Sequence, residues 1–214
     1  RKLANYVVDG SGFYAGKLVL KNDRLFVFGW IPTKAGNRDS GNIDWAGNLV
    51  AHELTADAQG QLNSILPQEL QKVISENPGP VTTLTSTKTL KTDTSFGPLQ
   101  SALYPALPER GELSATIDVP SAGMVMSFGL TDDRVSDAML NVVFNKSKGK
   151  VYFFNTPLAS IHQANAESWV DVPIGEKIEL RVLIQNSIAV FYINNKVAFS
   201  TRMYSMQEKP WSIS

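Results

Sequence analysis

The sequence holds 214 residues, of which 43% are hydrophobic and 19% charged, a composition that excludes wholesale disorder. Lys plus Arg and Asp plus Glu both number 20, so no net charge attracts nucleic acid or an anionic membrane surface. The absence of cysteine excludes disulfide frameworks, cysteine-ligated metals and cysteine nucleophiles. It leaves the compartment open, with a periplasmic or extracellular location favoured.

Residues 1–65 predict a small antiparallel sheet. Two apolar runs between residues 13 and 30 flank Lys21-Asn22-Asp23, which predicts a tight hairpin. A polar loop is expected over 33–45, followed by a third strand at 48–54. Strands at this spacing are typical of one blade of a β-propeller, a unit that leaves faces and edges exposed without its neighbours.

Residues 66–107 predict a linker with a short helix. Pro67 stands at the expected helix start, and Leu66, Leu70, Val73 and Ile74 would share one face. The sequence Asn77-Pro78-Gly79-Pro80 ends the helix, and the Thr-rich stretch after it predicts an extended connector.

Residues 108–214 predict an antiparallel β-sandwich. Residues 177–182 alternate polar and apolar side chains, and Asn-containing turns join them to apolar runs at 188–193 and 196–202. Asn tolerates the left-handed backbone that such turns need, so a three-stranded meander is expected. Further strands are predicted at 112–119, 124–130, 139–144 and 151–155.

Both ends of the sequence suggest a piece of a longer protein. The chain begins at Arg1 without a Met, and it closes on Trp211-Ser212-Ile213-Ser214, which is typical of a strand entering a sheet. We therefore expect a processed or truncated chain.

Several segments at the two ends of the chain share one resemblance. In the first half they are Asp9-Gly10-Ser11-Gly12-Phe13-Tyr14-Ala15, Leu25-Phe26-Val27-Phe28-Gly29-Trp30-Ile31, Asp44 to Leu54 and Leu66-Pro67-Gln68-Glu69-Leu70. In the second half they are Leu180-Arg181-Val182, Phe191-Tyr192-Ile193-Asn194 and Ser200-Thr201-Arg202-Met203-Tyr204. Together they resemble glycoside hydrolase family 32, the β-fructosidases. The resemblance implies an all-β chain: the last blade of a five-bladed propeller followed by a C-terminal sandwich.

The resemblance also implies that the catalytic carboxylates lie elsewhere. The family places its nucleophile in Trp-x-Asn-Asp-Pro, its transition-state stabiliser in Arg-Asp-Pro and its acid/base in Glu-Cys. None of these motifs occurs in the sequence, and Arg38-Asp39-Ser40, the nearest approach, has the surroundings of a surface loop. The expected partners are thus a fructoside-like saccharide and the missing N-terminal propeller blades. No cofactor is expected, and this chain alone is predicted to be inactive.

Three residues are candidates for contact with substrate. In the family, the Tyr of Asp-Phe-Tyr-Ala and the Trp closing the next strand line the sugar pocket, which implies this role for Tyr14 and Trp30. The family's Asp before Phe is Gly12 here, and Asp9 is the nearest carboxylate before it. Packing in the propeller core is the alternative role for both aromatic residues.

Two other kinds of function stay open. Exposure of Trp169 or Trp211 would favour a non-catalytic carbohydrate-binding module, whereas their burial would favour a purely structural sandwich. The two histidines, His52 and His162, lack a second ligand at metal-binding spacing, so exposed or hydrogen-bonded structural roles are expected.

Overall fold

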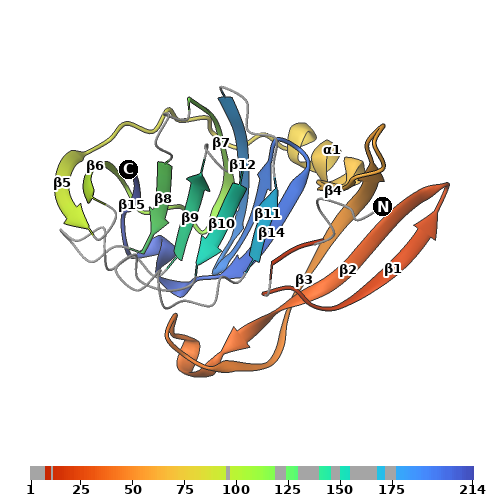
Figure 1. Cartoon of the computed structure of the whole chain (residues 1–214). Helices are drawn as coiled ribbons and strands as arrows, with labels where there is room; N and C mark the ends of the chain where they lie inside the picture. Colours follow the sequence, from red (N-terminus) through yellow and green to blue (C-terminus); the bar gives the residue numbers. More distant parts are fainter. Residues whose placement is uncertain are drawn as a thin grey trace.

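A computed structural model describes residues 8–10, 12–94, 97–118, 124–129, 140–145, 150–154, 168–171 and 177–214. The described strands form three antiparallel sheets (Figure 1). We call them the outer sheet, with order β1-β2-β3-β4, the central sheet, β14-β13-β12-β7, and the wide sheet, β11-β10-β9-β8-β15-β6-β5. The central and wide sheets make the predicted sandwich, and the outer sheet extends to one side of it (Figure 1).

The outer sheet contains the predicted hairpin. Its strands are β1 (Tyr14–Lys21), β2 (Arg24–Lys34), β3 (Ile43–Ala56) and β4 (Leu62–Ile65). The hairpin turn has Asn22 and Asp23 at φ 50° and 59°, the left-handed values that a two-residue turn requires. The predicted polar loop is shorter than expected, because Lys34 pairs with Ile43 and only a short 3₁₀ helix, η1 (Ala35–Asn37), and five further residues connect the strands.

The predicted helix is confirmed as α1 (Gln68–Glu76). Leu66 is buried just before it, and Ile74 packs against the same apolar cluster. Leu70 and Val73, expected on that face, are 44% and 56% exposed. The helix therefore buries less of its apolar surface than the pattern predicts.

Residues 66–107 hold more regular structure than the predicted linker. Strands β5 (Lys88–Thr94) and β6 (Gly97–Tyr104) form a hairpin within the wide sheet. They join it because β6 pairs with β15 (Trp211–Ile213), at the far end of the chain. A pairing between such distant segments leaves no local pattern in the sequence.

The remaining strands follow the predicted series closely, except that no strand was predicted at 168–171. They are β7 (Arg110–Asp118), β8 (Met124–Phe128), β9 (Leu140–Asn145), β10 (Lys150–Phe154), β11 (Ser168–Asp171), β12 (Lys177–Gln185), β13 (Ile188–Ile193) and β14 (Val197–Arg202), with a 3₁₀ helix, η5 (Tyr204–Gln207), before β15. The meander β12-β13-β14 is confirmed, and Asn186, Asn194 and Asn195 have φ between 46° and 53° at its turns.

Two apolar clusters lie on opposite faces of the central sheet. Strand β13 contributes Phe191 to the cluster shared with the wide sheet, and Val190 to the cluster shared with Ile31 and Val50 of the outer sheet. All six residues of β13 are buried as a result. The central sheet is therefore covered on both sides.

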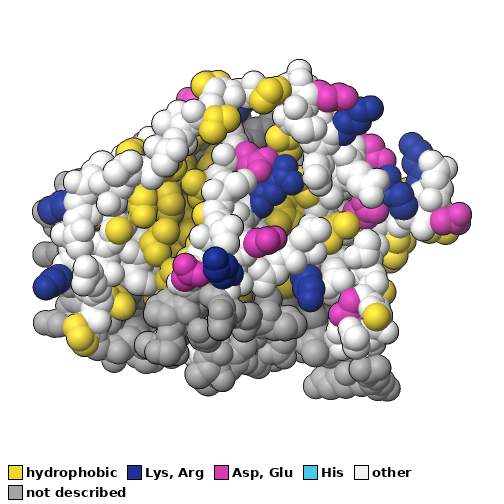
Figure 2. Space-filling view, turned by 90° about the horizontal axis from the view of Figure 1, so that it is seen from above, with side chains coloured by type: hydrophobic (Ala, Val, Ile, Leu, Met, Phe, Trp, Pro, Cys, Tyr) yellow, Lys and Arg dark blue, Asp and Glu magenta, His cyan; other side chains and the backbone are white. Residues whose placement is uncertain are grey.

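The surface carries mixed charge. Figure 2 shows Lys and Arg side chains interspersed with Asp and Glu on the face seen from above. Within the described ranges, no helix has the length and apolar character needed to span a membrane.

Candidate functional site

Tyr14 and Trp30 lie side by side on the outer sheet. They are paired in register between β1 and β2, and their ring centroids are 5.8 Å apart with the planes tilted by 37°. Tyr14 is 54% exposed and Trp30 is half-buried. Leu49, the register partner of Trp30 on β3, is 73% exposed. The two predicted aromatic residues thus form one accessible surface with an apolar neighbour.

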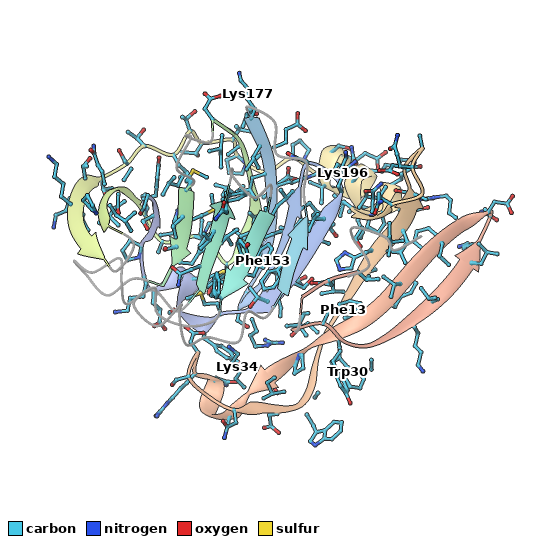
Figure 3. All side chains as sticks on the ribbon, in the orientation of Figure 1. Phe13, Trp30, Lys34, Phe153, Lys177 and Lys196 are labelled. Atoms are coloured by element: carbon cyan, nitrogen blue, oxygen red, sulfur yellow. The ribbon has the colours of Figure 1, made fainter. Side chains whose placement is uncertain are left out.

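This surface lies on the side of the outer sheet that faces away from the sandwich. Gly29 and Val50, the next register pair, are buried, and Val50 packs in the cluster against the central sheet. Because successive residues of a strand point to opposite faces, Trp30 points outward. Figure 3 labels Trp30 and Phe13 on the two sides of the sheet.

Asp9 does not lie with this pair. Its side chain is 1% exposed and is enclosed between the outer and central sheets. The Ser200 backbone N–H donates to Oδ1 at 2.6 Å, and the Ser200 hydroxyl donates to Oδ2 at 2.6 Å. The Gly10 N–H also donates to Oδ1. Asp9 therefore joins the segment before β1 to strand β14.

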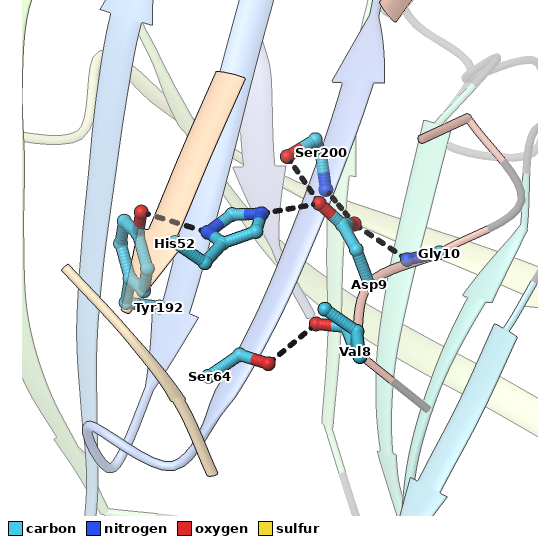
Figure 4. A network of polar contacts seen from close by, with 7 residues as sticks. All are labelled: Val8, Asp9, Gly10, His52, Ser64, Tyr192 and Ser200. Carbon is cyan, nitrogen blue, oxygen red and sulfur yellow. Dashed lines mark hydrogen bonds and ion pairs between the residues drawn. The ribbon is translucent and has the colours of Figure 1, made fainter. Parts of the chain in front are cut away.

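His52 completes the Asp9 network (Figure 4). Its Nε2 is 2.6 Å from Asp9 Oδ2 and its Nδ1 is 3.1 Å from the Tyr192 hydroxyl. An ionised carboxylate can only accept hydrogen bonds. Nε2 of His52 therefore carries the ring hydrogen, and Nδ1 accepts a hydrogen bond from the Tyr192 hydroxyl. Burial, followed by the nearby Asp9 charge, raises the pKa of Tyr192, which keeps this hydroxyl protonated. The prediction of a hydrogen-bonded structural His52 is confirmed.

The network has the residue types of a hydrolytic triad but a different arrangement. The Ser200 hydroxyl donates to Asp9, whereas an activated serine would donate to histidine. His52 is fully buried, and the Asp9 side chain nearly so. These groups therefore fasten two sheets together and do not meet a substrate.

Arg202 forms a second fastening between the same sheets. Its Nη2 donates to the carbonyl of Ile31 at 3.0 Å and to Asn48 Oδ1 at 2.6 Å. Its Nε donates to the Pro32 carbonyl and Nη1 to the Ser187 hydroxyl, both at 2.7 Å. Burial lowers the pKa of Arg202 from its ordinary value.

Asp39 forms a third fastening at the tip of the β2–β3 hairpin. Its carboxylate accepts from the backbone N–H groups of Tyr204 and Ser205 at 2.6 and 3.1 Å. The Tyr204 hydroxyl in turn accepts from the Lys34 N–H at 3.1 Å. Arg38-Asp39-Ser40 is thus a loop, as predicted, and Asp39 has a structural role that the sequence did not reveal.

No metal centre is evident in the part of the chain that the structure describes. Within those ranges, no three His, Asp or Glu side chains gather in a way that could hold an ion. His162 lies outside the described residues. The accessible chemistry of the described site is therefore that of two aromatic faces and a phenol hydroxyl.

Comparison with known families identifies the chain. The model of the C-terminal domain of BT1760-like GH32 proteins matches residues 57–214, well over half of the sequence. The chain belongs to this family. The predicted resemblance to glycoside hydrolase family 32 is thereby confirmed. No curated protein matches the chain.

Solved GH32 structures share the fold. Exo-inulinase from Aspergillus awamori matches with a TM-score of 0.61 and 13% identity, over 97% of this chain and 41% of the enzyme. Fructan 1-exohydrolase IIa from Cichorium intybus matches with 0.55 and 14%, over 96% and 45%. The β-fructofuranosidase from Aspergillus kawachii matches with 0.54 and 15%, over 96% and 44%. This GH32 chain thus spans less than half the length of these enzymes.

The structure describes the side chain of only one of the two sandwich tryptophans considered above. Trp211 is 4% exposed and stacks between Tyr104 and Phe128, with ring centroids 4.4 and 5.8 Å away. It therefore packs in the core of the GH32 sandwich and is closed to a ligand. The side chain of Trp169 lies outside the described part of the structure.

Proposed function

We propose that this chain is the C-terminal portion of a glycoside hydrolase that acts on fructosides or related saccharides. Its outer sheet would be the last blade of a five-bladed propeller, and the catalytic carboxylates would lie on blades that precede Arg1. The GH32 match supports the class of enzyme, and the sandwich would provide the framework that holds this blade.

The observation that carries this proposal is the exposure of β1. All eight of its residues are exposed, among them Leu18 at 63% and Leu20 at 70%. An apolar strand with both faces in solvent is costly and marks a surface that another element covers. Neighbouring propeller blades would cover these faces, and the inner edge of a blade would line the central channel.

Tyr14 and Trp30 would contribute one wall of the sugar pocket in this arrangement. Aromatic faces pack well against the C–H faces of a sugar ring, and a phenol hydroxyl donates a hydrogen bond to a sugar oxygen. The Tyr14–Trp30 pair offers both, and it lies on the accessible side of the outer sheet. Asp9, enclosed behind the sheet, would support this wall without touching the sugar.

Two measurements test the proposal. The purified 23.5 kDa chain, checked by intact mass, is incubated with sucrose, inulin and levan, and we expect no release of fructose. Fructose release at that mass would show that the catalytic acids are within this chain. Titration with 1-kestose, the sugar in the chicory enzyme complex, should perturb the signal of Trp30 in a fluorotryptophan-labelled protein. An unperturbed Trp30 signal would refute the pocket role.

A purely structural role of the sandwich is the second candidate. The three fastenings at Asp9, Asp39 and Arg202 all support it. Asp9 and Arg202 connect strand β14 of the central sheet to the outer sheet and the segment before it, and Asp39 connects the tip of the β2–β3 hairpin to η5. In this case the sandwich would stiffen the blade and bind no ligand of its own. Binding of 1-kestose that survives Trp30→Ala and Tyr14→Ala together would instead favour a carbohydrate-binding sandwich.

A further inference from the structure

The segment before β1 lies flush against strand β14. A Cβ on Gly12 would come within 2.8 Å of the Ser200 carbonyl oxygen, and one on Gly10 would enter the ring of Phe199. Only glycine permits this close approach. It explains why Gly12 stands where the family resemblance expects an aspartate, whose side chain would not fit here.

Asp9 fixes the position of this segment. Its two carboxylate oxygens receive hydrogen bonds from the backbone and the hydroxyl of Ser200, and from His52 Nε2, each at 2.6 Å. Tyr192 holds the other side of the imidazole. Strands β13 and β14 of the central sheet therefore both contribute to the anchor (Figure 4).

Phe13 connects the segment held by Asp9 to the outer sheet. Its N–H donates to the Gly10 carbonyl at 3.1 Å, and its ring lies 5.4 Å from the His52 imidazole. The ring fills the space left by Gly16 and Gly29: a Cβ on Gly16 would be 3.1 Å from it, and one on Gly29 would overlap it. The partly buried Phe13 thus packs between the anchor on one side and the sheet on the other.

Tyr14 follows Phe13 directly. Because Phe13 is directed inward, the next side chain emerges on the outer side, where it meets Trp30 with ring centroids 5.8 Å apart. The position of Tyr14 therefore depends on a short path of contacts that starts at Asp9 and Ser200 and ends at Phe13.

We propose that Asp9 is a positioning residue: through Gly10, Gly12 and Phe13 it holds Tyr14 against Trp30, so that strand β14 of the sandwich sets the geometry of this aromatic pair. That the pair contacts a saccharide rests on the function proposed above. The positioning itself does not depend on that function.

The test compares Asp9→Asn with Asp39→Asn in the full chain labelled with 5-fluorotryptophan. Asp39 is the matched control, because its carboxylate also accepts backbone N–H groups of the sandwich but lies at the hairpin tip, away from Phe13. The four tryptophan signals are assigned by single Trp→Phe variants. Asp9→Asn should shift or broaden the Trp30 signal and leave that of Trp211 in place, whereas Asp39→Asn should leave both unchanged.

Binding of 1-kestose supplies the second readout. Asp9→Asn should weaken it roughly tenfold, the scale expected when one aromatic contact is displaced. A Trp30 signal and a 1-kestose affinity both unchanged by Asp9→Asn would overturn the positioning role while leaving the proposed function standing. A moved Trp30 signal in a protein that does not bind 1-kestose would uphold the positioning role and refute the pocket.

Tyr192→Phe is a milder variant of the same network, and it keeps the test valid if Asp9→Asn fails to fold. It keeps the ring in the apolar cluster and removes only the hydroxyl that orients His52. We expect a smaller displacement of the Trp30 signal in the same direction. If Tyr192→Phe and Ser200→Ala both leave the Trp30 signal unmoved, the path through Asp9 does not set the pair.

Discussion

The Nε of Arg202 donates a hydrogen bond to the carbonyl oxygen of Pro32 at 2.7 Å, across 170 positions of the sequence. The same guanidinium reaches Ile31, Asn48 and Ser187. One side chain of β14 thereby satisfies acceptors on β2, on β3 and in the β12–β13 turn. The planar guanidinium, with five N–H donors, can reach these separate acceptors at once, whereas a compact lysine ammonium cannot.

Replacement of Arg202 by lysine should therefore destabilise the protein. We expect a loss of about 2–4 kcal/mol in the free energy of unfolding, because buried acceptors lose their donors. Urea unfolding followed by circular dichroism measures it. Arg110→Lys, at an exposed position of β7, is the matched control and should change little. Equal stability of the two variants would contradict the fastening role of Arg202.

Glu53 should make stability depend on pH. Hydrogen bonding from Arg24 is the main cause that lowers the pKa of this nearly buried carboxyl below its ordinary value of 4.5. A pKa lowered in the folded state gives stability that is present above the ordinary value and is lost as the pH falls through the folded one. Glu53→Gln should remove about 1–2 kcal/mol at pH 7 and flatten the decline toward pH 3.

Glu69→Gln is the control for that measurement. Glu69 also binds Arg24, and this contact lowers its pKa, but its side chain is 66% exposed. Solvent screens such a pair, so the variant should keep the stability and pH profile of the natural sequence. A steeper loss of stability toward acidic pH in Glu53→Gln than in Glu69→Gln would refute the assignment of this pH dependence to Glu53.

Asp39 should stabilise the hairpin tip independently of the aromatic pair. Tyr204 donates to one carboxylate oxygen of Asp39 and Ser205 donates to the other, so an amide, which keeps a single acceptor oxygen, leaves one of these residues facing an N–H group. Asp39→Asn should therefore cost about 1–3 kcal/mol. Faster hydrogen exchange of the Tyr204 and Ser205 amides would locate the effect, and unchanged exchange there would contradict it.

The connector between α1 and β5 should be the first site of proteolysis. Residues 78–86 lack helix and strand and are exposed, with Val81 95% and Leu84 39% accessible. Thermolysin, which cleaves beside large apolar residues, should cut there. The two fragments should remain together in size-exclusion chromatography, because the fastenings between the sheets do not involve the connector. Separation of the fragments at native pH would show that these contacts are weaker than their geometry indicates.

Local patterns predicted the elements with short-range causes. The Asn-containing turns need left-handed backbone, and the Asn22-Asp23 hairpin and the β12-β13-β14 meander are where the sequence placed them. A strand at 211–213 was likewise expected, but its pairing with β6 and β8 was not, since strand pairing between distant segments depends on tertiary packing.

The candidate site likewise combines residues that the sequence predicts with contacts between distant segments that it does not. The family resemblance pointed to Tyr14 and Trp30, but the predicted hairpin alone does not place them opposite each other, because a register shift between Tyr14 and Lys17 brings Tyr14 opposite Trp30. The partners of Asp9 lie 43 positions away at His52 and 191 positions away at Ser200, so no motif spacing links them. A buried polar network of this kind becomes visible only when the sheets are stacked.

Strand β13 has a consequence for how the chain unfolds. Its side chains alternate between the two apolar clusters, so detaching this one strand exposes both at once. The outer sheet and the sandwich then cannot melt as separate units, and calorimetry should record one transition whose van't Hoff enthalpy equals the measured heat. Shortening the chain to residues 88–214 would strip one face of β13, leaving a fragment prone to aggregation.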